Sequence, residues 1–65
     1  MAIRWEIWGR LPKDSVTSLL ARTPDPDSDF PDPTPQDEEL SRVFVRQLQN
    51  TGYVDVKARR IEEQG

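Results

Sequence analysis

The sequence predicts an α+β fold in which one helix packs on one face of a three-stranded, mainly antiparallel sheet. Residues 2–10 and 53–61 alternate apolar with charged side chains, which is the period of a strand with one buried face. Residues 40–49 instead repeat apolar side chains with the period of a helix. Residues 15–22 are rich in aliphatic side chains and supply a further strand. The expected chain order is β-β-α-β in a single domain spanning residues 1–65.

The first strand is expected at the centre of the sheet. Ile3, Trp5 and Ile7 are apolar and are separated by charged residues, and this strand has the most regular alternation in the chain. Pro12 lies in the turn that follows it. If the third strand pairs with the first, the spatial order is second, first, third, and every pair is antiparallel. A parallel pairing of the second and third strands through a right-handed crossover is the alternative.

The segment at residues 15–22 has two interpretations. Its β-branched and leucine side chains favour a strand that forms a hairpin with the first. A short helix over residues 15–21 competes with this, because Val16, Leu19 and Leu20 also fit a helical spacing and Asp14 is a suitable N-cap.

Residues 23–35 are expected to form an extended acidic connector. They contain five prolines interleaved with four aspartates, so neither a helix nor a strand ladder can continue through them. Such a segment tends toward polyproline II and is solvated. Phe30, in its middle, is the residue expected to hold the connector to the body of the protein.

The helix is predicted to begin with Thr34 as N-cap, Pro35 at N1 and Asp37 at N3. Its apolar stripe, which we expect to cover the sheet, consists of Leu40, Val43, Phe44 and Leu48. Gly52 suits the left-handed position that ends a helix. The last strand follows at residues 53–61, with Val54, Val56 and Ala58 on one side, and residues 62–65 are expected to fray.

Composition excludes several classes of function. Among the 65 residues there is neither cysteine nor histidine, which removes disulfides, the usual zinc ligands, thiol nucleophiles and the commonest general base. No catalytic residues, cofactor or metal site are predicted. No apolar run approaches the roughly 20 residues that span a bilayer. The N-terminal residues lack the apolar block of a signal peptide. We therefore expect a protein of the bacterial cytoplasm or of a virion, with no membrane partner.

Charge is segregated along the chain. Residues 23–39 contain seven carboxylates and no lysine or arginine, whereas all nine basic residues lie outside this segment. Asp25, Asp27 and Asp29 match the first three ligand positions of a calcium loop. Phe30 and Gln36 stand where that loop requires glycine and glutamate, so the pattern departs from it and an acidic linker is the alternative.

Trp8 is the leading candidate for a binding residue. It lies on the face of the first strand opposite to Ile3, Trp5 and Ile7, and therefore on the face that the helix leaves open. The residues expected near it are Arg4, Glu6, Tyr53, Lys57 and Arg59. The alternative is that Phe30, or the stems of Arg10 and Arg59, shield the indole. The second strand, guarded only by Arg22, is the expected edge for strand addition by a partner.

Two segments, Arg4–Arg10 and Leu48–Val56, resemble short uncharacterised proteins of bacteriophage and bacterial genomes. This resemblance implies a minor virion component or a host-directed binder. The chain also resembles the small core linkers of phycobilisomes in its run of strand, helix, glycine and basic strand, although the acidic proline segment departs from that family.

These observations predict a non-enzymatic accessory or structural subunit that binds protein partners in a larger assembly, such as a bacteriophage particle. Its predicted partner-binding residues are Trp8, Arg4, Tyr53, Lys57, Arg59, Asp25, Asp27, Asp29 and Phe30. The alternative is a small host-directed inhibitor or regulator that binds one protein through its acidic arm. A single-stranded nucleic-acid binder is a further alternative, but the acidic segment and the lack of a glycine-aromatic motif oppose it.

Overall fold

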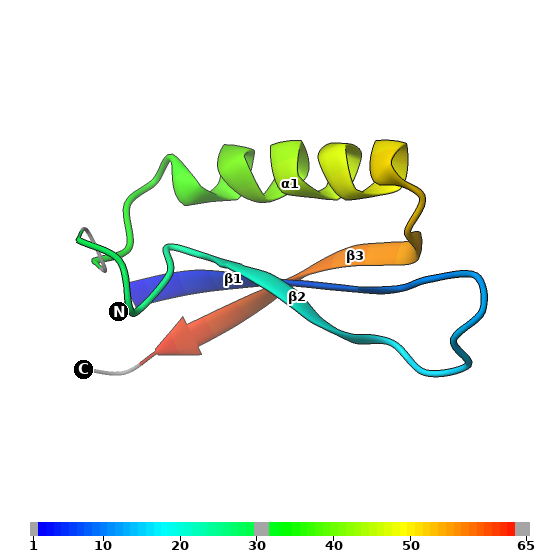
Figure 1. Cartoon of the computed structure of the whole chain (residues 1–65). Helices are drawn as coiled ribbons and strands as arrows, with labels where there is room; N and C mark the ends of the chain where they lie inside the picture. The colour runs from blue at the N-terminus through cyan, green and yellow to red at the C-terminus, as the bar shows by residue number, and fades with distance from the viewer. Residues whose placement is uncertain (1, 30–31, 64–65) are drawn as a thin grey trace.

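The computed structural model describes residues 2–29 and 32–63 and confirms the predicted order of elements. These elements are β1 (Ala2–Arg10), β2 (Ser18–Thr23), α1 (Asp37–Thr51) and β3 (Val54–Glu63). The strands form one antiparallel sheet in the order β2-β1-β3, so the parallel alternative is wrong. The helix packs along one face of the sheet and leaves the other face open (Figure 1).

The second segment is a strand, and the helical alternative for it is wrong. The strand begins at Ser18, three residues later than expected, and continues through Thr23. Ile7 lies opposite Ala21 and Trp8 lies opposite Leu19, so Leu20 is an extra residue in the ladder. This bulge turns Leu20 toward the same side as Ile7, where its side chain reaches the core.

Gly9 makes room for the packing around this bulge. A Cβ atom at Gly9 would lie 3.0 Å from Leu20 Cδ1 and 3.1 Å from Val56 Cγ2. These distances are shorter than ordinary contacts between carbon atoms, so the two side chains occupy the space that a larger residue would need. The glycine in the β1 strand therefore allows side chains from both neighbouring strands to meet across it.

β3 contains a second bulge, at Asp55, which has a φ of 55°. Its carboxylate accepts a hydrogen bond from Arg10 Nε at 2.8 Å. The bulge pairs Val54 with Arg10, whereas Lys57 pairs with Trp8. Val54 is therefore turned to the open face, and the prediction that it shares a side with Val56 and Ala58 is wrong. β3 also runs through Glu63, beyond its expected end at residue 61.

The helix begins at Asp37, and the prediction that Thr34 caps it through its side chain is wrong. Gln36 is the N-cap residue and makes no capping hydrogen bond with its side chain. Instead the Asp37 carboxylate reaches back, accepting hydrogen bonds from the backbone N–H of Thr34 at 2.6 Å and from Thr23 Oγ1 at 2.8 Å. Asp37 is 4% exposed, so one buried carboxylate joins β2, the connector and the helix.

The helix ends as predicted at Gly52, which has a φ of 116°. Its N–H donates to the carbonyl of Gln49, and the N–H of Tyr53 donates to the carbonyl of Leu48. This pair of bonds is a Schellman motif, which requires the left-handed conformation that glycine adopts most readily.

The helix face that meets the sheet is rotated from the predicted one. Leu40 and Val43 are each 45% exposed, whereas Ser41 is buried and Phe44 and Leu48 are half-buried. The face is centred on Ser41 because the Asp37 hydrogen bonds hold the first turn against β2. The predicted stripe is therefore wrong for Leu40 and Val43 and correct for the other two.

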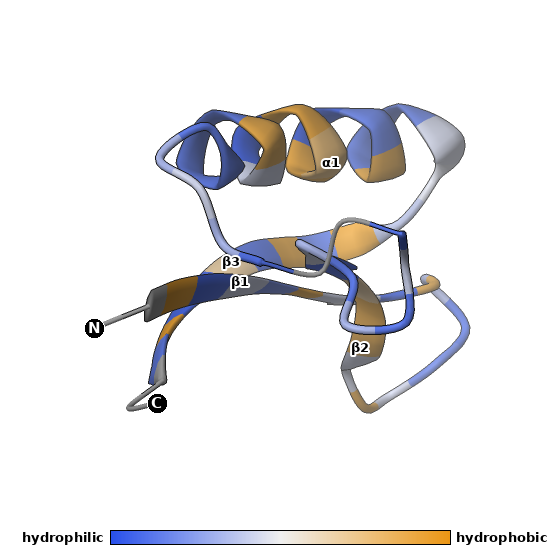
Figure 2. Ribbon diagram, turned by 90° about the vertical axis from the view of Figure 1, so that its left-hand side faces the viewer, coloured by the Kyte–Doolittle hydropathy of each residue, from blue (hydrophilic) through white to orange (hydrophobic). Residues whose placement is uncertain are grey.

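The core between α1 and the sheet is thin. Among the described residues, apart from Pro24 of the connector, the only buried apolar side chains are Ile7 and Val56. Hydrophobic and hydrophilic segments alternate along all the elements, so no element is apolar throughout (Figure 2). Within the described part of the chain, no helix has the length and apolar character needed to cross a membrane.

Candidate functional site

The open face of the sheet carries a hollow of about 640 Å³ beside Trp8. We call it the Trp8 groove and define it by its lining residues, which are Trp8, Thr17, Lys57, Ala58, Arg59 and Arg60. Its walls come from the central strand, the loop before β2, and β3. Its volume lies within the range of ligand-binding pockets, although the groove is open and shallow in form.

Strand register places the cations of β3 beside Trp8. Lys57 is the direct cross-strand partner of Trp8, and Arg59 is the partner of Glu6. Side chains of directly opposed residues in an antiparallel pair lie on the same face and close together. Trp8 is half-buried, and its Nε1–H donates a hydrogen bond to Glu6 Oε1 at 3.2 Å. The indole is thereby held in place with part of its surface available to a ligand.

The electrostatic character of this face is positive. Glu6 lies between two arginines, since Arg22 opposes it on β2 and Arg59 opposes it on β3. Arg22, Lys57 and Arg59 form no ion pair with the residues that the structure describes. Lys57 and Arg59 therefore leave positive charge beside Trp8 for an anionic ligand, whereas Arg22 lines a separate hollow with Asp25 and Asp32.

Two predicted site residues lie apart from the groove. Arg4 is on the same face of β1 as Trp8, and its guanidinium donates a hydrogen bond to the carbonyl of Pro24. It therefore ties the start of the connector to the sheet. Tyr53 lies between the end of α1 and the start of β3, is half-buried, and is not among the residues that line the groove.

The predicted acidic residues Asp25, Asp27 and Asp29 follow the end of β2, where the connector leaves the sheet (Figure 1). Asp25 and Asp27 belong to a turn in which Asp25 Oδ1 accepts the N–H of Asp27 at 2.9 Å. The Asp25 carbonyl accepts from both the N–H and the hydroxyl of Ser28, at 3.1 and 2.7 Å. Asp25, Asp27 and Asp29 are exposed, while Phe30 lies outside the described residues.

The described residues contain no set of side chains that could bind a calcium ion. Among them, no three Asp or Glu side chains lie together in a way that could hold a metal ion. Asp25 uses a carboxylate oxygen to close its own turn. We call residues 25–29 the acidic turn.

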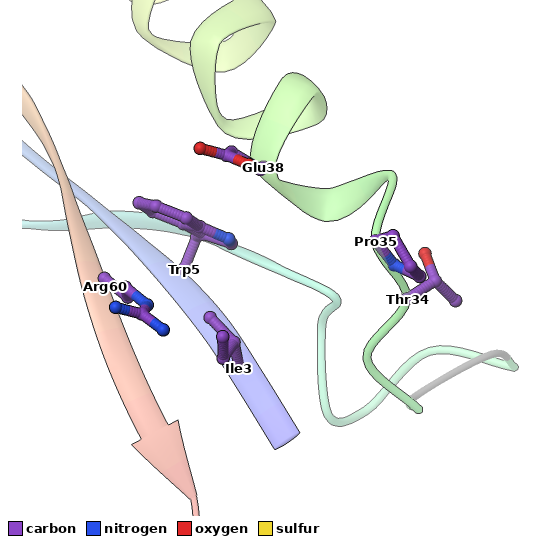
Figure 3. Close-up of a pocket in the computed structure, with 6 residues that line it drawn as sticks. All are labelled: Ile3, Trp5, Thr34, Pro35, Glu38 and Arg60. Carbon is purple, nitrogen blue, oxygen red and sulfur yellow. The ribbon is translucent and has the colours of Figure 1, made fainter. Parts of the chain in front are cut away.

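A second hollow, of about 380 Å³, lies on the helix side of the sheet (Figure 3). It is lined by Ile3, Trp5, Thr34, Pro35, Glu38 and Arg60. The Trp5 ring lies between Glu38 of the helix and Arg60 of β3 (Figure 3). Arg60 is the cross-strand partner of Trp5. Glu38 pairs with Arg42, and Arg60 pairs with Glu62, each at 3.3 Å. Both charged groups of this hollow are therefore already engaged.

Sequence reasoning missed several residues of these sites. Thr17 lines the groove because β2 begins only at Ser18, which leaves Thr17 in the loop before the strand, and this late start has no sequence signal as clear as the alternation of β1. The hollow on the helix side was missed because Ile3 and Trp5 fit a simple core pattern. The adjacency of Trp5 and Arg60 depends on the register between β1 and β3, which the alternation pattern alone does not specify.

The fold and the site together define a class of protein: a three-stranded antiparallel sheet with one covering helix, whose free face combines an aromatic side chain with unpaired cations. No protein-family model matches the chain, and neither a curated protein nor a solved structure matches it. The functional argument therefore depends on the geometry of the site.

Proposed function

We propose that the chain is a non-enzymatic, protein-binding subunit of a larger assembly, and that its Trp8 groove holds an acidic segment of a protein partner. The observation that carries the proposal is the pair of cations without an ion pair, Lys57 and Arg59, beside a half-buried tryptophan on an uncovered sheet face. Tryptophan and arginine are the residue types that contribute most to binding energy at protein interfaces.

The amount of exposed surface supports a partner. A typical monomer of this mass has an accessible surface of about 4,200 Å². This chain has 4984 Å², an excess of roughly 700 Å² over that expectation. One side of a standard protein interface buries about 800 Å². Part of the excess comes from the elongated shape, 38 × 19 × 18 Å, and a partner on the open face would cover surface of this order.

A protein partner fits the charge distribution better than a nucleic acid does. The seven carboxylates of residues 23–39 and the net charge of −3 repel a long phosphate backbone. A short acidic peptide segment contacts the groove alone and avoids most of that repulsion, because exposed charges are screened over about 8 Å at physiological salt. The finer proposal, that the assembly is a bacteriophage particle, rests on the resemblance of residues 4–10 and 48–56 described above.

A second candidate function uses the acidic turn. Its aspartates are exposed, and the turn is shaped by the hydrogen bonds of Asp25 to Asp27 and Ser28. A preformed anionic surface suits a basic cleft on another protein, as in a small inhibitor or regulator. In that case neutralising the turn abolishes partner binding, while neutralising the groove does not.

The test is a titration of the ¹⁵N-labelled protein with a capped peptide of alternating aspartate and proline. NMR chemical shifts of the backbone amides monitor the binding. We expect shifts at residues 8, 17 and 57–60, with affinity falling at least tenfold in Lys57→Gln/Arg59→Gln. The matched control is Arg42→Gln/Arg46→Gln, which removes two cations from the outer side of the helix and should leave affinity unchanged.

Three outcomes contradict the proposal. Shifts that spread evenly over the surface indicate a non-specific charge effect. An equal loss of affinity in the control variant places binding elsewhere. Tighter binding of a single-stranded oligonucleotide than of the acidic peptide assigns the groove to nucleic acid.

A further inference from the structure

We infer that the acidic segment held by the Trp8 groove is the acidic turn of a second copy of this chain, so that the protein associates head to tail. This inference depends on the proposed function, because it names the partner of the same groove. It is carried by the complementary charge of two surfaces of one molecule, the groove and the acidic turn.

The two surfaces are separated along the sheet. Trp8 pairs with Leu19, near the start of β2, whereas the acidic turn follows Thr23, at the end of β2. On β1, Trp5, the partner of Thr23, lies three residues from Trp8, which corresponds to about 10 Å. That length exceeds the screening distance of about 8 Å at physiological salt, so the attraction of Lys57, the cross-strand partner of Trp8, for the turn of its own copy is weak.

The turn cannot fold back onto its own groove without breaking the structure that holds it. Arg4 donates to the carbonyl of Pro24, and Thr23 donates to the buried carboxylate of Asp37. These bonds fix both the beginning of the connector and the start of the helix beyond it. A second copy can approach the groove freely, because the helix covers only the other face of the sheet (Figure 1).

The turn is held in shape by its own hydrogen bonds. The turn closes on itself through Asp25 and Ser28 and leaves the carboxylates of Asp27 and Asp29 exposed. In the docked pair these carboxylates meet Lys57 and Arg59, and Pro26, the exposed proline of the turn, packs on the Trp8 indole. Preformed surfaces lose little conformational entropy on binding. A contact between different surfaces on each copy is heterologous, and it produces rings or open filaments rather than a closed two-fold dimer.

The test measures molar mass by sedimentation over a range of concentrations. At low salt we expect mass to rise above the 7.5 kDa monomer as concentration increases, and to return to the monomer value at about 1 M salt, where screening acts over about 3 Å. Asp25→Asn/Asp27→Asn/Asp29→Asn should be monomeric, as should Lys57→Glu/Arg59→Glu. Circular dichroism confirms that both variants fold, since all five side chains are exposed.

Mixing the two variants gives the decisive result. One retains only a working groove and the other only a working turn, so the mixture should form a 1:1 heterodimer that cannot grow further. A mixture that stays monomeric overturns the inference, as does self-association of the turn variant at the wild-type level. If the groove binds the Asp-Pro peptide but the wild type remains monomeric, head-to-tail association fails and the proposed function stands. If the groove binds neither the Asp-Pro peptide nor a second copy, both the proposed function and the head-to-tail inference fail.

Discussion

The buried carboxylate of Asp37 provides the sharpest test of how this small core is held together. Asp37→Ala removes the acceptor for Thr23 Oγ1 at 2.8 Å and for the Thr34 N–H at 2.6 Å, and leaves the Thr23 hydroxyl, which is 3% exposed, without its partner. A hydrogen bond to a charged group contributes about 1.5–3 kcal/mol. The longer bond from Thr34 Oγ1 at 3.3 Å is lost as well, and because the losses are not additive we expect a decrease of about 2–4 kcal/mol in the free energy of unfolding.

That decrease is large for a chain of this length, whose whole stability is of the order of 3–10 kcal/mol. The midpoint of thermal unfolding should fall by roughly 4–8 °C for each kcal/mol. Urea unfolding, followed by tryptophan fluorescence and circular dichroism, measures the change. The matched control is Glu39→Ala in the same helical turn, where an exposed carboxylate contributes only about 0.3–1 kcal/mol through the helix dipole. If Asp37→Ala costs no more than this control, the buried network does not stabilise the fold as argued.

Three further substitutions test the packing, each by urea unfolding. Gly9→Ala places a methyl group 3.0 Å from Leu20 Cδ1 and should lower the free energy of unfolding by about 1–3 kcal/mol. Adding Leu20→Val should recover part of this loss. An unchanged stability of Gly9→Ala contradicts the close packing. Gly52→Ala forces a side chain into a φ of 116° and should cost about 1 kcal/mol, whereas a neutral result contradicts the left-handed cap. Val43→Ala should lower the free energy of unfolding by less than about 0.5 kcal/mol, because Val43 is largely exposed. Ile7→Ala should lower it by about 2–5 kcal/mol, and a larger loss for Val43→Ala than for Ile7→Ala contradicts the observed orientation of the helix.

The fold class could be predicted because β1 and the helix carry strong periodic signals. Alternation of Ile3, Trp5 and Ile7 with charged residues identifies the central strand, and Gly52 identifies the end of the helix. Once the first strand is central, short connections leave few arrangements open, and the antiparallel order follows.

The details that failed depend on interactions between residues distant in sequence. The orientation of the helix is decided by the hydrogen bond between Thr23 and Asp37, which are 14 positions apart. Helical periodicity alone predicted that Leu40 and Val43 face the sheet, because the pattern depends only on hydrophobicity. It contains no information about the carboxylate of Asp37, which is buried beside β2.

The candidate site was predicted only in outline. Trp8, Lys57 and Arg59 are brought together as the alternation pattern suggested, since the parity of residues in β1 and in most of β3 is regular. Val54 departs from that parity because the bulge at Asp55 inserts a residue. A bulge shifts every residue beyond it to the other face, and single-sequence patterns specify bulges poorly.

The most direct test of the Trp8 groove as a binding surface is an exchange of charge specificity measured by calorimetry. The wild type should bind the Asp-Pro peptide and not a peptide in which lysine replaces each aspartate. Lys57→Glu/Arg59→Glu should show the opposite preference, while Arg42→Glu/Arg46→Glu on the outer side of the helix should behave as the wild type does. If the helix variant exchanges its specificity and the groove variant does not, the groove is not the site.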